Sequence, residues 1–304
     1  MVPCFNESDC IAETAGRIVS SLVDAEVTNY EIIFVNDGSV DSTLAQLIVL
    51  QKSNKRIFVV DLSRNHGHQL ALSAGLSVAK GERVLIIDAD LQDPPELIGQ
   101  MMKALDQGAD VAYGQRISRV GESWFKKQSA KIFYRFLAGS SNVKIPVNTG
   151  DFRLMTRQVL DVLLSMPEAH RYIRGMIAWV GFNQVAIPYD RAPRFAGATK
   201  YPLRKMLALA IDASTSFAAT PLRFMYIVSM CAGISALLLF CWSVFVYFQR
   251  STVPGWTSLM CVVLAFMAVQ MFSQAILGEY VARTFLQSKQ RPLFVIRRIY
   301  GVGK

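Results

Sequence analysis

Two long stretches without a charged residue constrain this chain more than any other feature of its sequence. They cover Phe224–Phe248 and Ser251–Gly278, and only a short link separates them. Each is longer than the roughly 20 residues with which a helix crosses a bilayer. The pattern predicts a transmembrane hairpin over 222–280, with helices at about 224–248 and 254–278. A buried hairpin inside a large soluble protein is the alternative, but little else in the chain is available to cover it.

The chain carries a formal net charge of +9, and much of this excess lies outside the two ends of the expected hairpin. Only Arg250 lies in the link, so the positive-inside rule predicts that both termini are cytosolic. Met1–Asp9 lacks the apolar core of a signal peptide, which favours the cytosol for the first domain as well. No helix-turn-helix, zinc or RNA-binding motif accompanies the charge, and we therefore expect no nucleic-acid partner.

Two basic, partly apolar segments are candidates for helices at a membrane surface. Tyr201–Phe217 combines Arg204 and Lys205 with an apolar face, which predicts an interfacial helix within 201–221. Trp124–Phe136 is either a second such helix or a solvated amphipathic helix. Residues 281–304 are expected to form a basic cytosolic tail.

The first half of the chain has the pattern of a mostly parallel wound sheet. Apolar, β-branched runs predict strands at Glu31–Asn36, Ile57–Leu62 and Arg83–Asp88. Helices are predicted between and after them, at Ala12–Val23, Ser42–Lys52, Gln69–Ala79 and Pro95–Gln107. Such sheets bind ligands where their strands end. The polar clusters of this sequence fall at those ends, which predicts a binding site there.

Asp88-Ala89-Asp90, at the end of a predicted strand, is the strongest chemical signal. Residues two apart in an extended chain point the same way, so both carboxylates are expected to face one spot. Mg²⁺ and Mn²⁺ favour such oxygen ligands and are often held by one or two carboxylates together with substrate phosphates. A pair of solvated loop carboxylates is the alternative, although the Pro-Pro pair and helix that follow favour a site.

Two strand-to-helix turns carry further polar groups. Gly38 permits a sharp turn close to a ligand, and Asp41 or Ser42 is placed to cap the next helix. Asp37 has no evident structural role in the sequence, which suggests that it binds a base or ribose. Pro3–Glu7 forms the other turn.

Taken together, the motifs resemble those of a known family. In chain order they are Pro3-Cys4-Phe5-Asn6-Glu7, Asn36-Asp37-Gly38-Ser39 with Asp41 and Thr43, Arg64-Asn65-His66-Gly67, Asp88-Ala89-Asp90-Leu91-Gln92-Asp93-Pro94-Pro95, Asn148-Thr149-Gly150-Asp151-Phe152-Arg153, and Arg194-Phe195 with Gly197 and Lys200-Tyr201-Pro202. This order resembles family 2 of the inverting glycosyltransferases. With the hairpin, the chain looks like the bacterial polyprenyl-phosphate (bactoprenol) glycosyltransferases, relatives of dolichol-phosphate mannose synthase. The resemblance covers nearly the whole chain.

The resemblance implies a fold, a location and a reaction. It implies a GT-A-type nucleotide-binding domain over 1–200, in a multi-pass protein of the bacterial inner membrane. The reaction would be inverting transfer of a hexose, glucose from UDP-glucose first, to the lipid undecaprenyl phosphate, with Mg²⁺ or Mn²⁺. The product would serve lipopolysaccharide, O-antigen or other cell-envelope modification. Other UDP-hexoses, UDP-4-amino-arabinose derivatives and GDP-mannose remain open as donors.

The resemblance also assigns site residues. The positions that hold the uridine-type nucleotide match Pro3, Phe5, Glu7, Asp37 and Asp88. The metal carboxylates match Asp88 and Asp90, with Asp90 in direct contact. The catalytic positions match Asp151, usually described as the base, and Arg194 and Lys200, which meet phosphates.

Three features of the sequence have more than one interpretation. Only Met1 and Val2 precede the first turn where the family has a longer strand, so the central strand is expected to be truncated. A phosphate acceptor is mostly dianionic at neutral pH and has no proton to give up, so Asp151 is either a base or a residue that orients Lys200 or Arg153 or binds metal or sugar. His66 and His68 either approach a diphosphate or are exposed residues at the start of a helix.

Two other functions remain as alternatives. A processive polysaccharide synthase would need more membrane helices and a Gln-x-x-Arg-Trp motif, which this sequence lacks. A non-catalytic membrane scaffold is favoured by the short first strand but not by the intact aspartates. Gln270 and Gln274 would share one helix face and suggest a homo-oligomer.

Overall fold

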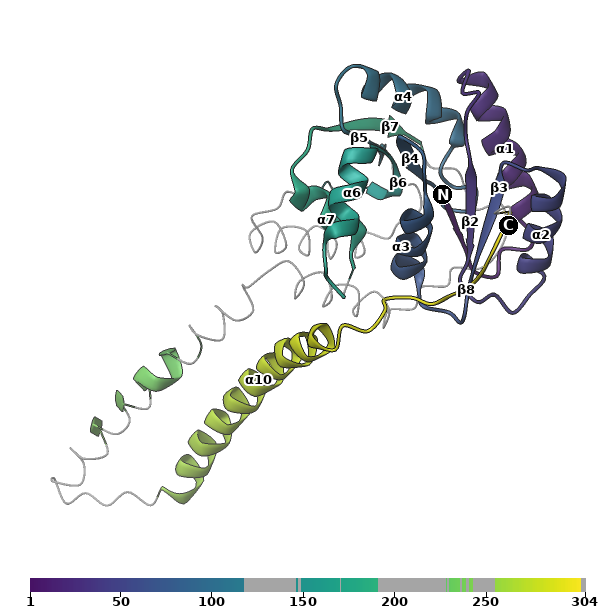
Figure 1. Ribbon diagram of the computed structural model, residues 1–304. Helices are drawn as coiled ribbons and strands as arrows, with labels where there is room; N and C mark the ends of the chain where they lie inside the picture. Colours follow the sequence, from purple (N-terminus) through teal and green to yellow (C-terminus); the bar gives the residue numbers. More distant parts are fainter. Residues whose placement is uncertain are drawn as a thin grey trace.

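The computed structural model describes residues 1–117, 146, 149–169, 171–190, 228, 230–235, 237, 238, 241, 242 and 255–301. Among these, the first half of the chain folds as strands alternating with helices (Figure 1). Each strand and helix that the sequence predicts in this half is present, with ends that differ by a few residues.

The first sheet contains three parallel strands and an antiparallel edge strand. Its order is β1 (Val2–Cys4), β2 (Ile32–Asn36), β3 (Ile57–Leu62) and β8 (Ile296–Tyr300). The connections run through α1 (Ile11–Asp24) and α2 (Thr43–Ser53), and α3 (His68–Val78) follows β3. β8 lies within the predicted basic tail and pairs antiparallel with β3, with Val60 opposite Ile299.

The second sheet is mixed. Its order is β4 (Arg83–Ile86), β6 (Thr149–Thr156), β5 (Val111–Arg116) and β7 (Gln184–Tyr189), with β6 antiparallel to both neighbours. The described helices that accompany this sheet are the 3₁₀ turn η1 (Pro95–Leu97), α4 (Ile98–Asp106), α6 (Arg157–Ser165) and α7 (Ile173–Val180). The expected mostly parallel sheet therefore holds for β1 to β3, whereas β6 and β8 run the other way.

Met1 joins the two sheets. Its amino nitrogen donates to Leu85 O at 2.8 Å, and its own carbonyl accepts from Ile87 N at 3.2 Å. β1 pairs with β2, and Met1, directly before it, contacts β4, so β1 lies between these two strands.

Both faces of the central strands are buried, which requires helices on both sides. Along β2, Ile33 and Val35 contribute to a core on the side of α3, α6 and α7, while Ile32 and Phe34 contribute to a core on the side of α1 and α4. This alternation is the period of two expected of a strand. It explains why the predicted strands read as continuous apolar runs.

The predicted transmembrane hairpin is corrected by the structure. No helix in the described part of the chain is both long and apolar enough to cross a membrane. α10 (Trp256–Ser288) does not end near Gly278 as predicted, but continues through the ion pair of Glu279 with Arg283. The predicted end of the helix rested on the length of the apolar run alone, whereas the helix continues into charged residues.

The predicted location of the protein depended on the hairpin and is corrected with it. The assignment to the bacterial inner membrane as a multi-pass protein is corrected because it rested on two spanning helices. The interfacial helix expected within 201–221 and the segment Trp124–Phe136 lie outside the described residues, as does most of 224–248.

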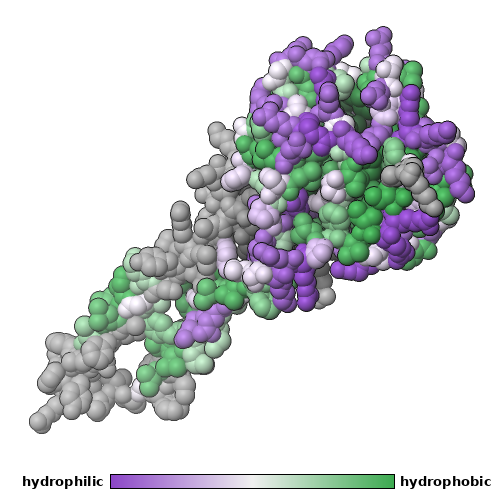
Figure 2. Space-filling view, viewed as in Figure 1, coloured by the Kyte–Doolittle hydropathy of each residue, from purple (hydrophilic) through white to green (hydrophobic). Residues whose placement is uncertain are grey.

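α10 projects away from the sheets and carries apolar side chains (Figures 1 and 2). Leu259, Met271 and Phe272 are each more than half exposed. Its last turns are tied to the α/β part of the chain by Gln287, which accepts from Ala169 N at 2.7 Å and donates to Pro167 O at 2.5 Å.

The close packing of α3 on the sheet predicts opposite effects for two Gly→Ala substitutions. A Cβ at Gly75 would lie 2.7 Å from Val35 Cγ2, so Gly75→Ala should overpack the core and lower the free energy of unfolding by about 1–3 kcal/mol. Gly16 is exposed on α1 with nothing near its Cβ position, so Gly16→Ala should raise stability by about 0.5–1 kcal/mol. Urea denaturation of both variants measures this. A Gly75→Ala protein at least as stable as wild type would contradict the packing.

Candidate active site

The turns that follow β1 and β2 are locked to each other by hydrogen bonds. Asn6 N donates to Ser39 Oγ at 3.0 Å, and Asn6 Oδ1 accepts from Val40 N at 2.9 Å. Glu7 N donates to Thr43 Oγ1 at 3.0 Å. The polar residues of both motifs therefore serve first to fix the backbone at the carboxyl ends of these strands. Phe5, in the first turn, is 38% exposed.

Asp37 has a structural role that its sequence context did not reveal. Its side chain is buried, and its two oxygens accept from the backbone N–H groups of His66 at 2.7 Å and Gly67 at 2.9 Å. Burial raises the pKa of Asp37, and these two bonds partly oppose that rise. The carboxylate thus closes the loop between β3 and α3.

Gly38 is needed for this loop to approach. Its φ is +66°, and a Cβ there would lie 2.5 Å from Asn65 N. The Asn-Asp-Gly-Ser motif and the Arg-Asn-x-Gly motif are therefore two halves of one packed unit.

Asp88 and Asp90 follow β4 at the same edge of the sheet. Asp88 Oδ1 is buried and has no hydrogen-bond partner among the described residues, and His68 Nε2 lies 3.8 Å from it. Burial, and then the charges of Asp151, Asp93 and Asp90, raise the pKa of Asp88 to about 6, although His68 opposes them. Asp90 Oδ1 accepts from Gln92 N at 3.2 Å.

This donor set fits a hard divalent cation only in part. A buried carboxylate oxygen without a partner is what such an ion would satisfy. However, no group of three or more His, Cys, Asp or Glu side chains in the described ranges is arranged to hold a metal by itself. Two carboxylates would need oxygens from a ligand to complete the shell.

Asp93 completes the acidic motif from a different position. It is buried, it accepts a hydrogen bond from Tyr189 Oη, and Arg116 Nη2 lies 3.7 Å away. Asp93 therefore anchors the motif to β5 and β7, while Asp88 and Asp90 remain partly exposed at the strand end.

Asp151, on β6, is the most heavily paired carboxylate of the site. Its side chain is 3% exposed. It accepts from Arg174 Nε at 2.8 Å and Nη2 at 3.3 Å, from His68 Nε2 at 3.0 Å and from Gln69 Nε2 at 3.4 Å. Burial opposes its ionisation, but Arg174 and His68 outweigh that effect and hold the pKa of Asp151 well below its usual range.

Sequence reasoning missed part of this cluster. His68 was left as either a diphosphate contact or an exposed residue, and the structure brings it to Asp151. Arg174 was not singled out, although it is the single charged residue within the apolar helix α7. His66 does not join the cluster, because its backbone binds Asp37 and its ring lies 3.4 Å from Ser63 Oγ. Arg194 and Lys200 lie outside the described residues.

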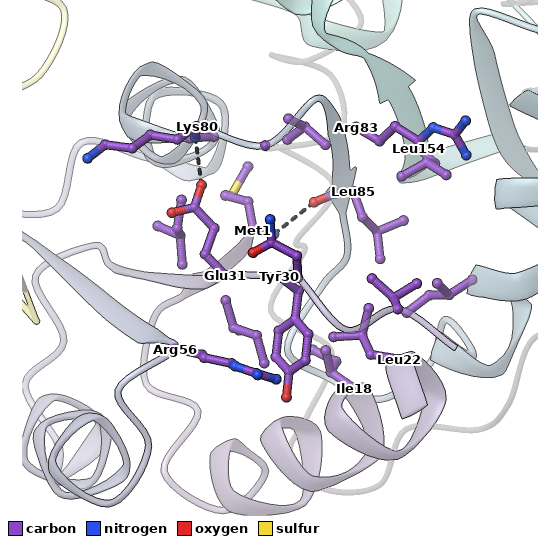
Figure 3. Close-up of a pocket in the computed structure, with 18 of the residues that line it drawn as sticks. Met1, Ile18, Leu22, Tyr30, Glu31, Arg56, Lys80, Arg83, Leu85 and Leu154 are labelled. Atoms are coloured by element: carbon purple, nitrogen blue, oxygen red, sulfur yellow. Dashed lines mark hydrogen bonds between the residues drawn. The ribbon is translucent and has the colours of Figure 1, made fainter. Parts of the chain in front are cut away.

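A cavity of about 810 Å³ lies at the opposite end of the strands. Figure 3 shows it bordered by Met1, Tyr30 and Glu31, with the bond from Met1 to Leu85 crossing its wall. Among the described residues, none of those predicted for the site lines this cavity. The candidate site is therefore the open edge where the strands end.

Comparison with known proteins gives a family. The profile described as "Glycosyl transferase family 2" matches residues 1–164. An "Uncharacterized glycosyltransferase YkcC" of Bacillus subtilis (strain 168) is 42% identical over 303 residues, which are 99% of this chain and 94% of that protein. A "Bactoprenol glucosyl transferase" of Shigella phage SfV is 34% identical over 298 residues, 98% of this chain and 97% of that protein.

One solved structure shows a weaker similarity, at lower sequence identity. Glucosyl-3-phosphoglycerate synthase from Mycobacterium tuberculosis, crystallised with Mn²⁺, UDP and phosphoglyceric acid, has a TM-score of 0.47 and 20% identity. The match covers 69% of this chain and 73% of that chain. This degree of likeness assigns none of those ligands to the present chain.

The pairing of His68 with Asp151 predicts a pH dependence of stability. Burial lowers the pKa of His68, but the bond to Asp151 and the charge of Asp88 raise it to about 9. The unfolded value is about 6.5, so this stabilisation is fully present below pH 6.5 and is lost as pH rises towards 9. The melting temperature, measured with a chelator present, should fall less steeply across this window in His68→Gln than in wild type.

His66→Gln is the control for this measurement. Burial and Arg64 lower the pKa of His66, the opposite direction to His68, so loss of this imidazole should not make the fall in melting temperature less steep. Equal slopes for His68→Gln and wild type would show that His68 does not gain a proton on folding.

Proposed function

The chain belongs to glycosyl transferase family 2, and we propose that it transfers a hexose from a nucleotide sugar to the phosphate of a polyprenyl lipid. The observation that carries this proposal is the identity of 34% with a bactoprenol glucosyl transferase over nearly the full length of both chains. The site supports it with Asp88 and Asp90 at the end of β4, with His68 3.8 Å from Asp88, and with Arg174 paired to Asp151.

The finer proposal is a single displacement with UDP-glucose as donor and undecaprenyl phosphate as acceptor. An acceptor phosphate oxygen forms a bond to the anomeric carbon while the bond from that carbon to the diphosphate breaks. The bonding electrons leave with UDP, and the configuration inverts. The second pKa of a phosphate monoester is about 6, so the acceptor needs no base at neutral pH. The glycolipid would then donate its sugar to a cell-envelope glycan such as O-antigen.

Each part of the site has a role in this proposal. Asp88 and Asp90 would hold Mg²⁺ or Mn²⁺ together with donor oxygens, and the ion would offset charge on the departing diphosphate. Phe5 offers an exposed ring where β1 ends, suited to contact with the base. Pro3 lies within β1, and Glu7 lies in the turn that follows it.

Asp37 would act on the nucleotide through the loop that it holds, because both of its oxygens accept backbone N–H groups. Arg194 and Lys200 remain candidates for contact with phosphates.

An assay with extracted lipid tests the reaction. The purified full chain is incubated in detergent with undecaprenyl phosphate, Mg²⁺ or Mn²⁺ and a panel of labelled nucleotide sugars. We expect a lipid with one sugar, with UDP-glucose as the best donor and an inverted anomeric configuration. Asp90→Ala should lower kcat/KM at least about 100-fold, because an electrostatic group at the leaving diphosphate is lost.

Asp24→Ala is the matched control, since Asp24 is exposed at the end of α1. It should keep wild-type activity. A long polymer as product would replace the proposal with a processive synthase. No product from any donor would favour a non-catalytic scaffold.

The incomplete metal ligand set predicts that metal and nucleotide bind together. Mn²⁺ titrated calorimetrically into the nucleotide-free protein should bind weakly, and UDP should raise its affinity at least about 10-fold. By linkage, Mn²⁺ should raise the affinity for UDP by the same factor. Tight binding of Mn²⁺ without UDP would contradict the fit described for Asp88 and Asp90.

A further inference from the structure

We propose that His68 and Arg174 form the subsite for the acceptor's phosphate, and that Asp151 is the positioning residue that holds them there. This inference rests on the proposed function and assigns the acceptor end of the same site. It gives Asp151 a different role from the base that the resemblance implies.

Asp151 is placed to hold cations and poorly placed to receive a proton from a substrate. Arg174 contacts both of its oxygens in a fork, and His68 bonds to Oδ2. Such charge-assisted, two-point bonds fix orientation as well as position. The Asp151 side chain is 3% exposed, whereas those of His68 and Arg174 are 37% and 24% exposed. A ligand that reaches this cluster therefore meets the two nitrogen-bearing side chains before the carboxylate.

The frame around the two side chains is rigid and comes from three elements. Gln69, at the start of α3, donates to Asp151 Oδ2 and accepts from Ile173 N at 2.9 Å. Arg174 Nη1 also donates to Thr149 O at 3.1 Å. Hydrogen bonds of His68, Gln69 and Arg174 therefore link α3 and α7 to β6 and to each other. A subsite built in this way is set before any ligand arrives, which reduces the cost of binding.

The order of groups along the edge of the sheet separates this subsite from the nucleotide. Phe5 and Asp37 follow β1 and β2, Asp88 and Asp90 follow β4, and Asp151 lies on β6, the neighbour of β4. A donor with its base near β1 and its diphosphate at Asp88 would direct its sugar towards β6. The acceptor phosphate must approach that sugar from the side away from the diphosphate. In this arrangement that is the side of β6, where His68 and Arg174 are bonded to Asp151.

Steady-state kinetics on the full chain tests the assignment. His68→Gln keeps an N–H group for Asp151, and Arg174→Lys keeps a positive charge, so both are conservative changes. We expect each to raise the KM for undecaprenyl phosphate about 10-fold or more and to change the KM for UDP-glucose less than about twofold. Arg17→Gln is the control, because Arg17 pairs with Glu96 on the surface of α1.

A double-variant cycle tests the role of Asp151. A positioning residue acts through its partners, so Asp151→Asn combined with Arg174→Gln should cost less than the product of the two single losses, with His68 left as a partner. The combined variant also removes both members of the ion pair, which avoids leaving one buried charge alone. A base would instead add its own loss of about 10²–10⁴-fold in kcat to that of Arg174→Gln.

The outcomes separate the inference from the function on which it rests. If the wild-type protein gives no lipid product, both the proposed function and the subsite assignment are wrong. A product from wild type together with an unchanged KM for the lipid phosphate in both conservative variants overturns the subsite alone. A rise confined to the KM for UDP-glucose assigns the cations to the donor's diphosphate, which also overturns it. If the loss of kcat in the double variant equals the product of the two single losses, Asp151 acts as the base.

Discussion

The buried charge of Asp151 is the constraint on which the site depends. A carboxylate with almost no exposure is tolerated only when cations and hydrogen-bond donors compensate for lost water. Here those groups come from α3 and α7, which are far apart in the sequence. Satisfying one charge therefore brings the two helices to β6 and fixes the side chains that face the open edge of the sheet.

A second buried carboxylate, Asp37, organises the turns after β1 and β2 in the same manner. Asp37 accepts two backbone N–H groups of the loop after β3, and Gly38 leaves room for that loop to come close. Asn6 then ties the turn after β1 to the turn after β2. Between these two locked regions, Asp88 retains a buried oxygen without a hydrogen bond from the described residues. Asp151 and Asp37 therefore have more hydrogen-bond donors around them than Asp88 has.

The sequence was a good guide wherever a signal was local. The alternation of apolar runs with helices predicted β2, β3 and β4, and the turn motifs were placed correctly at their carboxyl ends. It was a poor guide to antiparallel pairing, because nothing within Ile296–Tyr300 indicates that these residues add to β3. The apolar run near the C-terminus predicted a hairpin that the described helices do not form. Run length alone did not reveal that α10 continues into Glu279 and Arg283.

The sequence by itself determined the family, the fold class of the first half and the identity of the acidic motif. Each of these depends on residue types at short, fixed spacings along the chain. Only the tertiary structure decided which cations Asp151 meets. His68 precedes it by more than eighty positions and Arg174 follows it by more than twenty, and neither spacing has a local signature. Partners at such separations are set by the packing of α3 and α7 on the sheet, and burial then makes their charges matter.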